Sequence, residues 1–158
     1  MARYNTWQNR SLYGAADALG DDARQQDCGA FWGSLHATLA HTLWGDQIWM
    51  SRFSDTPAPP AHNQPHSVAD VASWKDLKAT RVIFDETIET WSRSLTDDWL
   101  RADLTWYSGA AGRQVTKPAW FLVTHFFNHQ THHRGQVHCM LTQAGIKTDD
   151  TDLFFLQD

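Results

Sequence analysis

Hydrophobic residues recur every three or four positions over four long stretches of this chain, which is the spacing of an amphipathic α-helix. The stretches are residues 2–18, 28–53, 70–95 and 118–145. Polar breaks separate them, and the first break, residues 21–27, is predicted to be a turn. Four long helices with two long connections predict an all-α fold, a four-helix bundle.

The two long connections differ in character. Residues 54–69 contain four prolines, which forbid a regular helix, and a loop of this length is a candidate rim of a functional site. Residues 102–117 alternate between apolar and polar on both sides of a Gly-rich turn, which predicts a small β-hairpin before the last long helix. Two shorter segments complete the chain. Residues 96–101 are predicted to form a single turn, and the tail 146–158 is predicted to pack back on the bundle through its apolar end.

The last long helix, residues 118–145, carries two histidines inside its apolar stripe. It opens with a proline and closes at a glycine, as helices do. On a 3.6-residue wheel the stripe lies within roughly 80° and contains Leu122, Phe126, His129, His133, Val137 and Met140. Since His129 and His133 are four residues apart, their rings can point at one spot. Either both rings are neutral and hydrogen-bonded, or both bind one divalent metal, which satisfies two acceptor nitrogens at once.

A metal site with an open position needs a third protein ligand and a water. Residues 28–53 offer His36 and His41, and periodicity does not decide between them. His36 lies nearer the edge of the main apolar stripe of that helix, whereas His41 belongs to a second, narrower strip. His125 and His132 are further candidates within the last long helix.

Asp46 lies near the centre of the apolar stripe of the second helix, and a buried carboxylate needs a partner. One interpretation is a carboxylate that faces the site, where it is the best candidate for a catalytic general base. The other is an ion pair or hydrogen bond inside the bundle. Around the histidine pair, Gln136 is placed to orient a ligand histidine. Arg134 is expected to point away from the stripe and to form an ion pair or meet a partner, and Gly135 suggests close approach of a neighbouring helix. Asn5 is expected to tie the first helix to the bundle.

Composition excludes several classes of function. A chain of 158 residues suggests one domain over residues 1–158, and a net charge of -5 argues against nucleic acid as a partner. No apolar run has membrane-spanning length, and no signal-peptide pattern opens the chain. Two cysteines are too few for a disulfide framework, which favours a cytoplasmic location. No Ser-His-Asp arrangement and no phosphate-binding loop compete with the histidines.

Four segments together resemble the DinB/YfiT-like metalloenzyme family, named for damage-inducible proteins. They are Tyr4–Trp7, Phe31–Trp49, Asn128–Gln136 and Asp152–Leu153. The resemblance implies an up-down-down-up four-helix bundle, usually a homodimer. It also implies a metal site built from one histidine in the middle of the second helix and a His-x-x-x-His pair on the last. Carried over to this sequence, the ligands are His41, His129 and His133, which decides for His41 over His36.

The same resemblance suggests a function. Relatives in the wider superfamily resemble thiol-dependent S-transferases and a mycothiol-dependent isomerase. This implies an enzyme in which Zn or Ni, with Fe also compatible, activates a low-molecular-weight thiol towards a small-molecule substrate. A metal-binding stress-response protein without turnover shares the same histidines and is the main alternative. A third hypothesis is an interaction module whose histidines are only hydrogen-bonded.

Overall fold

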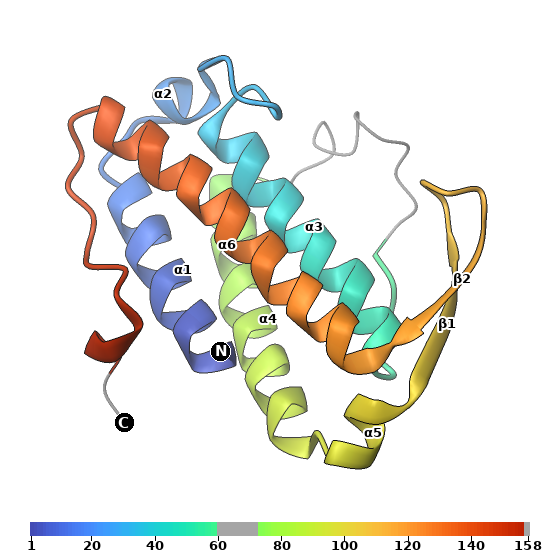
Figure 1. Cartoon of the computed structure of the whole chain (residues 1–158). Coiled ribbons are helices and arrows are strands. Elements are labelled where there is room, and N and C mark those ends of the chain that lie inside the picture. Colours follow the sequence, from blue (N-terminus) through green and yellow to red (C-terminus); the bar gives the residue numbers. More distant parts are fainter. Residues whose placement is uncertain (60–72, 157–158) are drawn as a thin grey trace.

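Four long helices form a bundle in the computed structural model, which describes residues 1–59 and 73–156 (Figure 1). They are α1 (Ala2–Ala16), α3 (Leu35–Phe53), α4 (Trp74–Ser94) and α6 (Ala119–Gln143). They run up, down, down and up in chain order (Figure 1). Because α1 contacts α4 and α6, and α3 contacts the same two helices, the four close around one core. The predicted four-helix bundle is confirmed. None of the described helices is both long and apolar enough to cross a membrane.

The core contains the apolar stripes of all four helices. Its most deeply buried side chains include Leu35, Met50, Ile88, Phe126, Val137 and Leu141. Aromatic rings fill the end of the bundle near the C-terminus of α3, where Phe53 stacks on Trp91 with ring centroids 5.3 Å apart, and Phe126 meets both edge-on. Much of the aromatic content of the chain is therefore packing.

The second long helix begins later than its hydrophobic pattern predicts. Helix α3 starts at Leu35 rather than at residue 28, and the side chain of Ser34 caps it by accepting a hydrogen bond from the Ala37 N–H at 3.1 Å. Gly29 and Gly33 have φ angles of 71° and 77°, which interrupt a right-handed helix. The predicted turn before it is also partly helical, because α2 spans Asp21–Gln25.

Helix α4 begins at Trp74 and is capped by Ser73, which accepts a hydrogen bond from the Asp76 N–H. Most of the proline-rich loop that is predicted to be a site rim lies outside the described residues. The predicted single turn before the hairpin is α5 (Asp97–Arg101).

A two-stranded hairpin precedes the last helix, as predicted. It consists of β1 (Asp103–Ser108) and β2 (Arg113–Pro118), which pair antiparallel with Trp106 opposite Val115. The ring of Trp106 meets that of Trp49 on α3, with centroids 5.6 Å apart. The hairpin therefore delivers an aromatic side chain to the outer face of α3.

The C-terminal tail returns along α1 and ends in a short 3₁₀ helix, η2 (Leu153–Phe155). Polar side chains of α1 bind its backbone: Tyr4 donates to the Thr151 carbonyl at 2.7 Å, and Gln8 donates to the Asp150 carbonyl at 2.9 Å. Leu153, Phe154 and Phe155 are 54%, 77% and 49% exposed, so the prediction that the apolar end packs back on the bundle is largely wrong, and hydrogen bonds to the backbone hold the tail instead.

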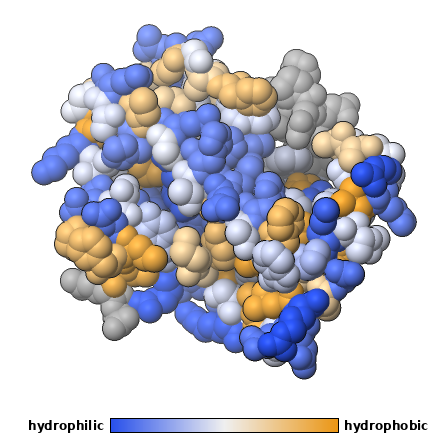
Figure 2. Space-filling model, viewed as in Figure 1, coloured by the Kyte–Doolittle hydropathy of each residue, from blue (hydrophilic) through white to orange (hydrophobic). Residues whose placement is uncertain are grey.

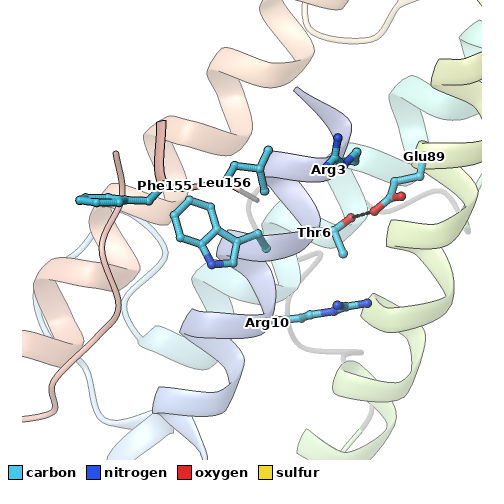
Figure 3. A pocket seen from close by; sticks show the side chains of 7 residues that line it. Arg3, Thr6, Arg10, Glu89, Phe155 and Leu156 are labelled. Atoms are coloured by element: carbon cyan, nitrogen blue, oxygen red, sulfur yellow. Dashed lines mark hydrogen bonds between the residues drawn. The ribbon is translucent and has the colours of Figure 1, made fainter. Parts of the chain in front are cut away.

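Between α1, α4 and this tail lies a cavity of about 490 Å³ (Figure 3). Its lining residues are Arg3, Thr6, Trp7, Arg10, Glu89, Phe155 and Leu156. On one side, Thr6 Oγ1 donates to Glu89 Oε1 at 2.6 Å and joins α1 to α4 (Figure 3). This cavity involves none of the histidines singled out by the sequence.

Candidate metal centre

Three histidines from two antiparallel helices meet at the interface of α3 and α6. His41 comes from α3, and His129 and His133 come from adjacent turns of α6. The Nε2 atom of His129 lies 3.3 Å from that of His41 and 3.1 Å from that of His133. Each ring can offer one nitrogen such that all three nitrogens lie within 4.8 Å of one another. The structure thus brings together the three histidines that the family resemblance indicates.

Gly45 creates the room for this arrangement. It lies one turn after His41 on α3, and a Cβ atom at this position would stand 2.8 Å from Cε1 of His129. Real Cβ atoms do not approach other atoms so closely, so only glycine allows the His129 ring its place. Our sequence reasoning missed this residue. The available signal was a helical glycine one turn beyond a candidate ligand.

The three imidazoles are held in the neutral form. Burial lowers the pKa of His41 to about 3, and repulsion from His133 and His129 adds to the effect. Burial likewise lowers the pKa of His129 to about 4, with His133 as the next cause. The pKa of His133 is also lowered by burial, against the opposing effect of its hydrogen bond to Gln136. Because metals bind the neutral ring, the site is ready for a cation near neutral pH.

Gln136 fixes the tautomer of His133. Its Oε1 lies 2.8 Å from Nδ1 of His133, and an amide oxygen only accepts hydrogen bonds. With the amide oriented in this way, Nδ1 carries the proton and the lone pair of Nε2 faces the other two rings. The predicted role of Gln136 as an orienting residue agrees with this contact.

A metal cation satisfies this cluster better than protons do. A single proton on Nε2 of His129 can point along only one of its two N···N contacts, and the other contact is then left without a well-directed hydrogen bond. Zn–N bonds of about 2.0–2.1 Å place two ligand nitrogens about 3.3–3.4 Å apart at a tetrahedral angle and about 2.8–3.0 Å apart at a right angle. The observed separations of 3.1 and 3.3 Å fall within this range. The donor set therefore fits a divalent metal.

The surroundings leave the cluster closed on one side and open on another. Trp32, from the turn before α3, stacks on His41 with ring centroids 3.8 Å apart. His129 is only half-buried, and the exposed rings of His125 and His132 lie beside the pair, 5.9 Å from His129 and 4.9 Å from His133. Figure 2 shows hydrophilic side chains gathered over the middle of α6, on the face turned towards solvent.

The other candidate histidines do not join the cluster. His36 is buried more than one turn before His41, and its ring contacts Trp74 with centroids 5.8 Å apart. Within the described parts of the chain, the grouping that could hold a metal through three nitrogens contains neither His125 nor His132. The structure thus places His41, rather than His36, beside the pair on α6.

Asp46 has an arginine partner inside the bundle. It is fully buried, with Oδ2 2.7 Å from Nη1 of Arg81 and Oδ1 accepting from Nε2 of Gln130 at 2.9 Å. Arg81 also pairs with Asp85 at 2.9 Å. These contacts are those of the structural interpretation of Asp46, and its catalytic role stays a prediction. Gln130, the neighbour of His129 in sequence, ties this ion pair to α6.

The same polar layer extends to α1. Asn5 donates to Oδ1 of Asp85 at 3.2 Å and accepts from Arg134, so it ties α1 to α4 and α6 as expected. Two predictions about α6 are wrong. Arg134 is buried in this layer rather than pointing away, because Asn5 supplies an acceptor for its guanidinium. Gly135 is exposed and faces open space, so the close helix approach occurs at Gly45 instead.

Two antiparallel helices of a four-helix bundle bring three neutral imidazoles together. This fold and this site are those of a candidate metalloprotein. Comparison with known proteins gives the family. The sequence model of the DinB family matches residues 1–158, and the chain belongs to this family.

Two relatives are similar over most of their length. Protein DinB of Bacillus subtilis (strain 168) is 25% identical over 153 residues, which cover 96% of this chain and 88% of that protein. The crystal structure of a DinB-like protein from Bacillus cereus ATCC 10987 has a TM-score of 0.60 at 20% identity, covering 92% of this chain and 91% of that one. This similarity shows that the two share a fold.

Proposed function

We propose that the protein is a metal-dependent enzyme that activates a low-molecular-weight thiol and transfers it to an electrophilic small molecule. The observation that carries the proposal is the convergence of His41, His129 and His133, with one side of the cluster open. Three histidine ligands leave at least one position on a divalent metal for an exogenous group. Membership of the DinB family supports this assignment.

Each residue of the site has a defined task in this proposal. The metal, held by the three Nε2 atoms, would lower the pKa of a thiol or water in its open position. Gln136 keeps the lone pair of His133 directed at the centre, and Gly45 keeps the His129 ring in place. Trp32 covers one face of His41 and restricts water there. The half-buried edge of His129 is the side from which substrates approach.

The proposed reaction is a substitution at carbon. The thiol releases its proton to solvent, and the sulfur lone pair forms the new S–C bond. The electron pair of the breaking C–X bond leaves with X, for example as halide. No oxidant or reductant is needed. A homodimer, a cytoplasmic location and the choice between Zn, Ni and Fe stay predictions.

The first experiment is elemental analysis of protein purified without an affinity tag. Wild type is compared with His41→Ala and His133→Ala, and with His138→Ala as a matched control on the same helix. We expect about one divalent metal per chain in wild type and in the control, and loss of that metal in the two ligand variants. Metal retained in His41→Ala would overturn the ligand assignment.

Turnover is then measured as loss of free thiol with a panel of aryl halides and epoxides. The metal-loaded wild type should consume thiol, and the metal-free protein should not. Stoichiometric metal without thiol consumption for any electrophile would favour the alternative, a metal-binding stress-response protein without turnover.

A further inference from the structure

Arg52, in the last turn of α3, is held by aromatic rings instead of by a carboxylate. Its guanidinium carbon lies 4.5 Å from the ring centre of Trp49 and 5.7 Å from that of Trp106. The side chain is half-buried, and burial lowers its pKa. Within residues 1–59 and 73–156 it forms no ion pair with an acidic group. A partly desolvated cation without a counter-ion is unusual, because desolvation of a charge normally requires a partner.

The other arginines that the bundle buries each donate to at least one oxygen acceptor, although Nε of Arg24 and Nε of Arg81 are buried without a hydrogen-bond partner among the described residues. Arg24 donates to the carbonyl of Ala16, Arg81 to Asp46 and Arg134 to Asn5. Arg52 differs from these because it is only half-buried and donates to no oxygen acceptor among the described residues. Rings that pack on the face of a guanidinium leave its edge free, and that edge is a two-pronged donor that matches a carboxylate.

Arg52 also stands in line with the metal centre. On α3, Arg52 comes seven residues after Gly45, the residue that adjoins His129. Seven residues are about two helical turns, or about 10 Å along the helix axis. His125 fills the interval on α6, with its ring 5.9 Å from that of His129 and 5.0 Å from that of Trp49. A continuous row of side chains therefore leads from the open side of the cluster to the guanidinium.

The hairpin is part of this arrangement. Its strand β1 alternates between exposed and half-buried positions, and Trp106 is a half-buried position that meets both Trp49 and Arg52. The hairpin thus supplies one of the two rings that orient the guanidinium. A structural role for the hairpin alone would not need an aromatic side chain over an unpaired arginine.

We propose that Arg52 binds a carboxylate of the thiol substrate while the sulfur of that thiol lies at the three histidines. The substrate class is therefore an elongated acidic thiol, because about two helical turns, or about 10 Å along the axis of α3, separate the level of the cluster from that of Arg52. This inference rests on the proposed function, since it takes the histidine cluster as the place of the sulfur. Arg52 is a specificity-determining residue in this scheme. It takes no part in bond making.

The test uses two thiols of equal length, 6-mercaptohexanoate and 6-mercaptohexanol. Each is titrated into protein loaded with Co²⁺, and binding is measured by the near-ultraviolet charge-transfer band of a Co²⁺-bound thiolate. The variants are Arg52→Gln and Arg52→Lys. Arg113→Gln, which removes an exposed arginine from the hairpin, is the matched control.

In wild type and in Arg113→Gln we expect the carboxylate thiol to bind about tenfold more tightly than the alcohol, as one charged hydrogen-bonded contact implies. Arg52→Gln should remove this difference and leave the affinity for 6-mercaptohexanol unchanged, which also shows that the variant is folded. Arg52→Lys should retain only part of it, because an ammonium lacks the planar fork.

Equal binding of the two thiols by wild type, or an undiminished preference in Arg52→Gln, would overturn the role of Arg52 alone. Absence of the charge-transfer band with both thiols in wild type would instead overturn the proposed thiol chemistry, and the role of Arg52 with it.

Discussion

Two glycines in the middle of long helices allow a matched test of the site. Gly45 on α3 adjoins His129, whereas Gly135 on α6 faces open space. Replacing either by alanine should raise helix stability by about 1 kcal/mol if nothing else changes. Only at Gly45 does the new methyl group meet a proposed metal ligand, so the pair separates helix propensity from site geometry.

The size of the effect at Gly45 follows from the distances. The Cβ atom would stand 2.8 Å from Cε1 of His129. Carbon atoms in ordinary contact are about 3.5–4.0 Å apart, so the ring must withdraw by about 0.7 Å or more. Metal–ligand distances tolerate errors of only about 0.2 Å. We therefore expect Gly45→Ala to weaken metal binding by about 10–100-fold, the range typical of a misplaced ligand.

The assays are competition with a chelating dye for metal affinity and urea unfolding of the metal-free protein. Gly135→Ala should be about 1 kcal/mol more stable than wild type and bind metal equally well. Gly45→Ala should gain less stability, because the His129 ring has to move. If Gly45→Ala gained the full increment and bound metal like wild type, the close contact with His129 and the proposed site would both be refuted.

Three further predictions follow from the contacts. Gln136→Leu removes the acceptor for Nδ1 of His133 and should weaken metal binding about 10–100-fold in the same dye assay, without loss of the fold. Asp46→Asn removes the negative charge that pairs with the buried Arg81 and should lower the unfolding free energy by about 3 kcal/mol or more. Asp97→Asn, at an exposed ion pair, should change the unfolding free energy by under about 1 kcal/mol. Equal effects of the two substitutions in urea unfolding would contradict the buried pair. Since the fold lowers the pKa of His41 from 6.5 to about 3, the unfolded chain takes up the proton first on acidification. Metal-free protein should therefore lose stability between about pH 6.5 and pH 3, by at most about 1.4 kcal/mol per pH unit for each such histidine. A His41→Phe variant whose stability fell just as steeply would show that this ring is not responsible.

Most of the fold could be predicted from the sequence because hydrophobic periodicity extends along each long helix. The ends of the helices were predicted less well. The apolar pattern of α3 begins at residue 28, but the glycines in this segment adopt positive φ and Ser34 provides the cap, so the helix starts at Leu35. Periodicity reports which side chains face the core and does not report where the backbone turns.

The candidate site was only partly accessible to the same reasoning. The pair on α6 follows from its spacing of four residues, but the choice of His41 over His36 depends on how α3 is rotated against α6, which a helical wheel of one helix does not contain. The family resemblance supplied that choice. Gly45 and Trp32 were missed because their importance comes from contacts between segments far apart in the sequence or outside the helix. Arg134 was misplaced because the wheel shows no acceptor on α1.

The buried polar layer has a consequence for how the chain can vary. Asp46 on α3, Arg81 on α4 and Gln130 on α6 hold one another through charges and hydrogen bonds that reach few other partners. If one helix slid by a turn, an arginine or a carboxylate would be left alone in an apolar interior, at a cost of several kcal/mol. Gln130 adjoins His129, so the same slide would separate the histidines. The layer therefore fixes the relative height of the three nitrogens from inside the core, without any contribution from the tail or the hairpin.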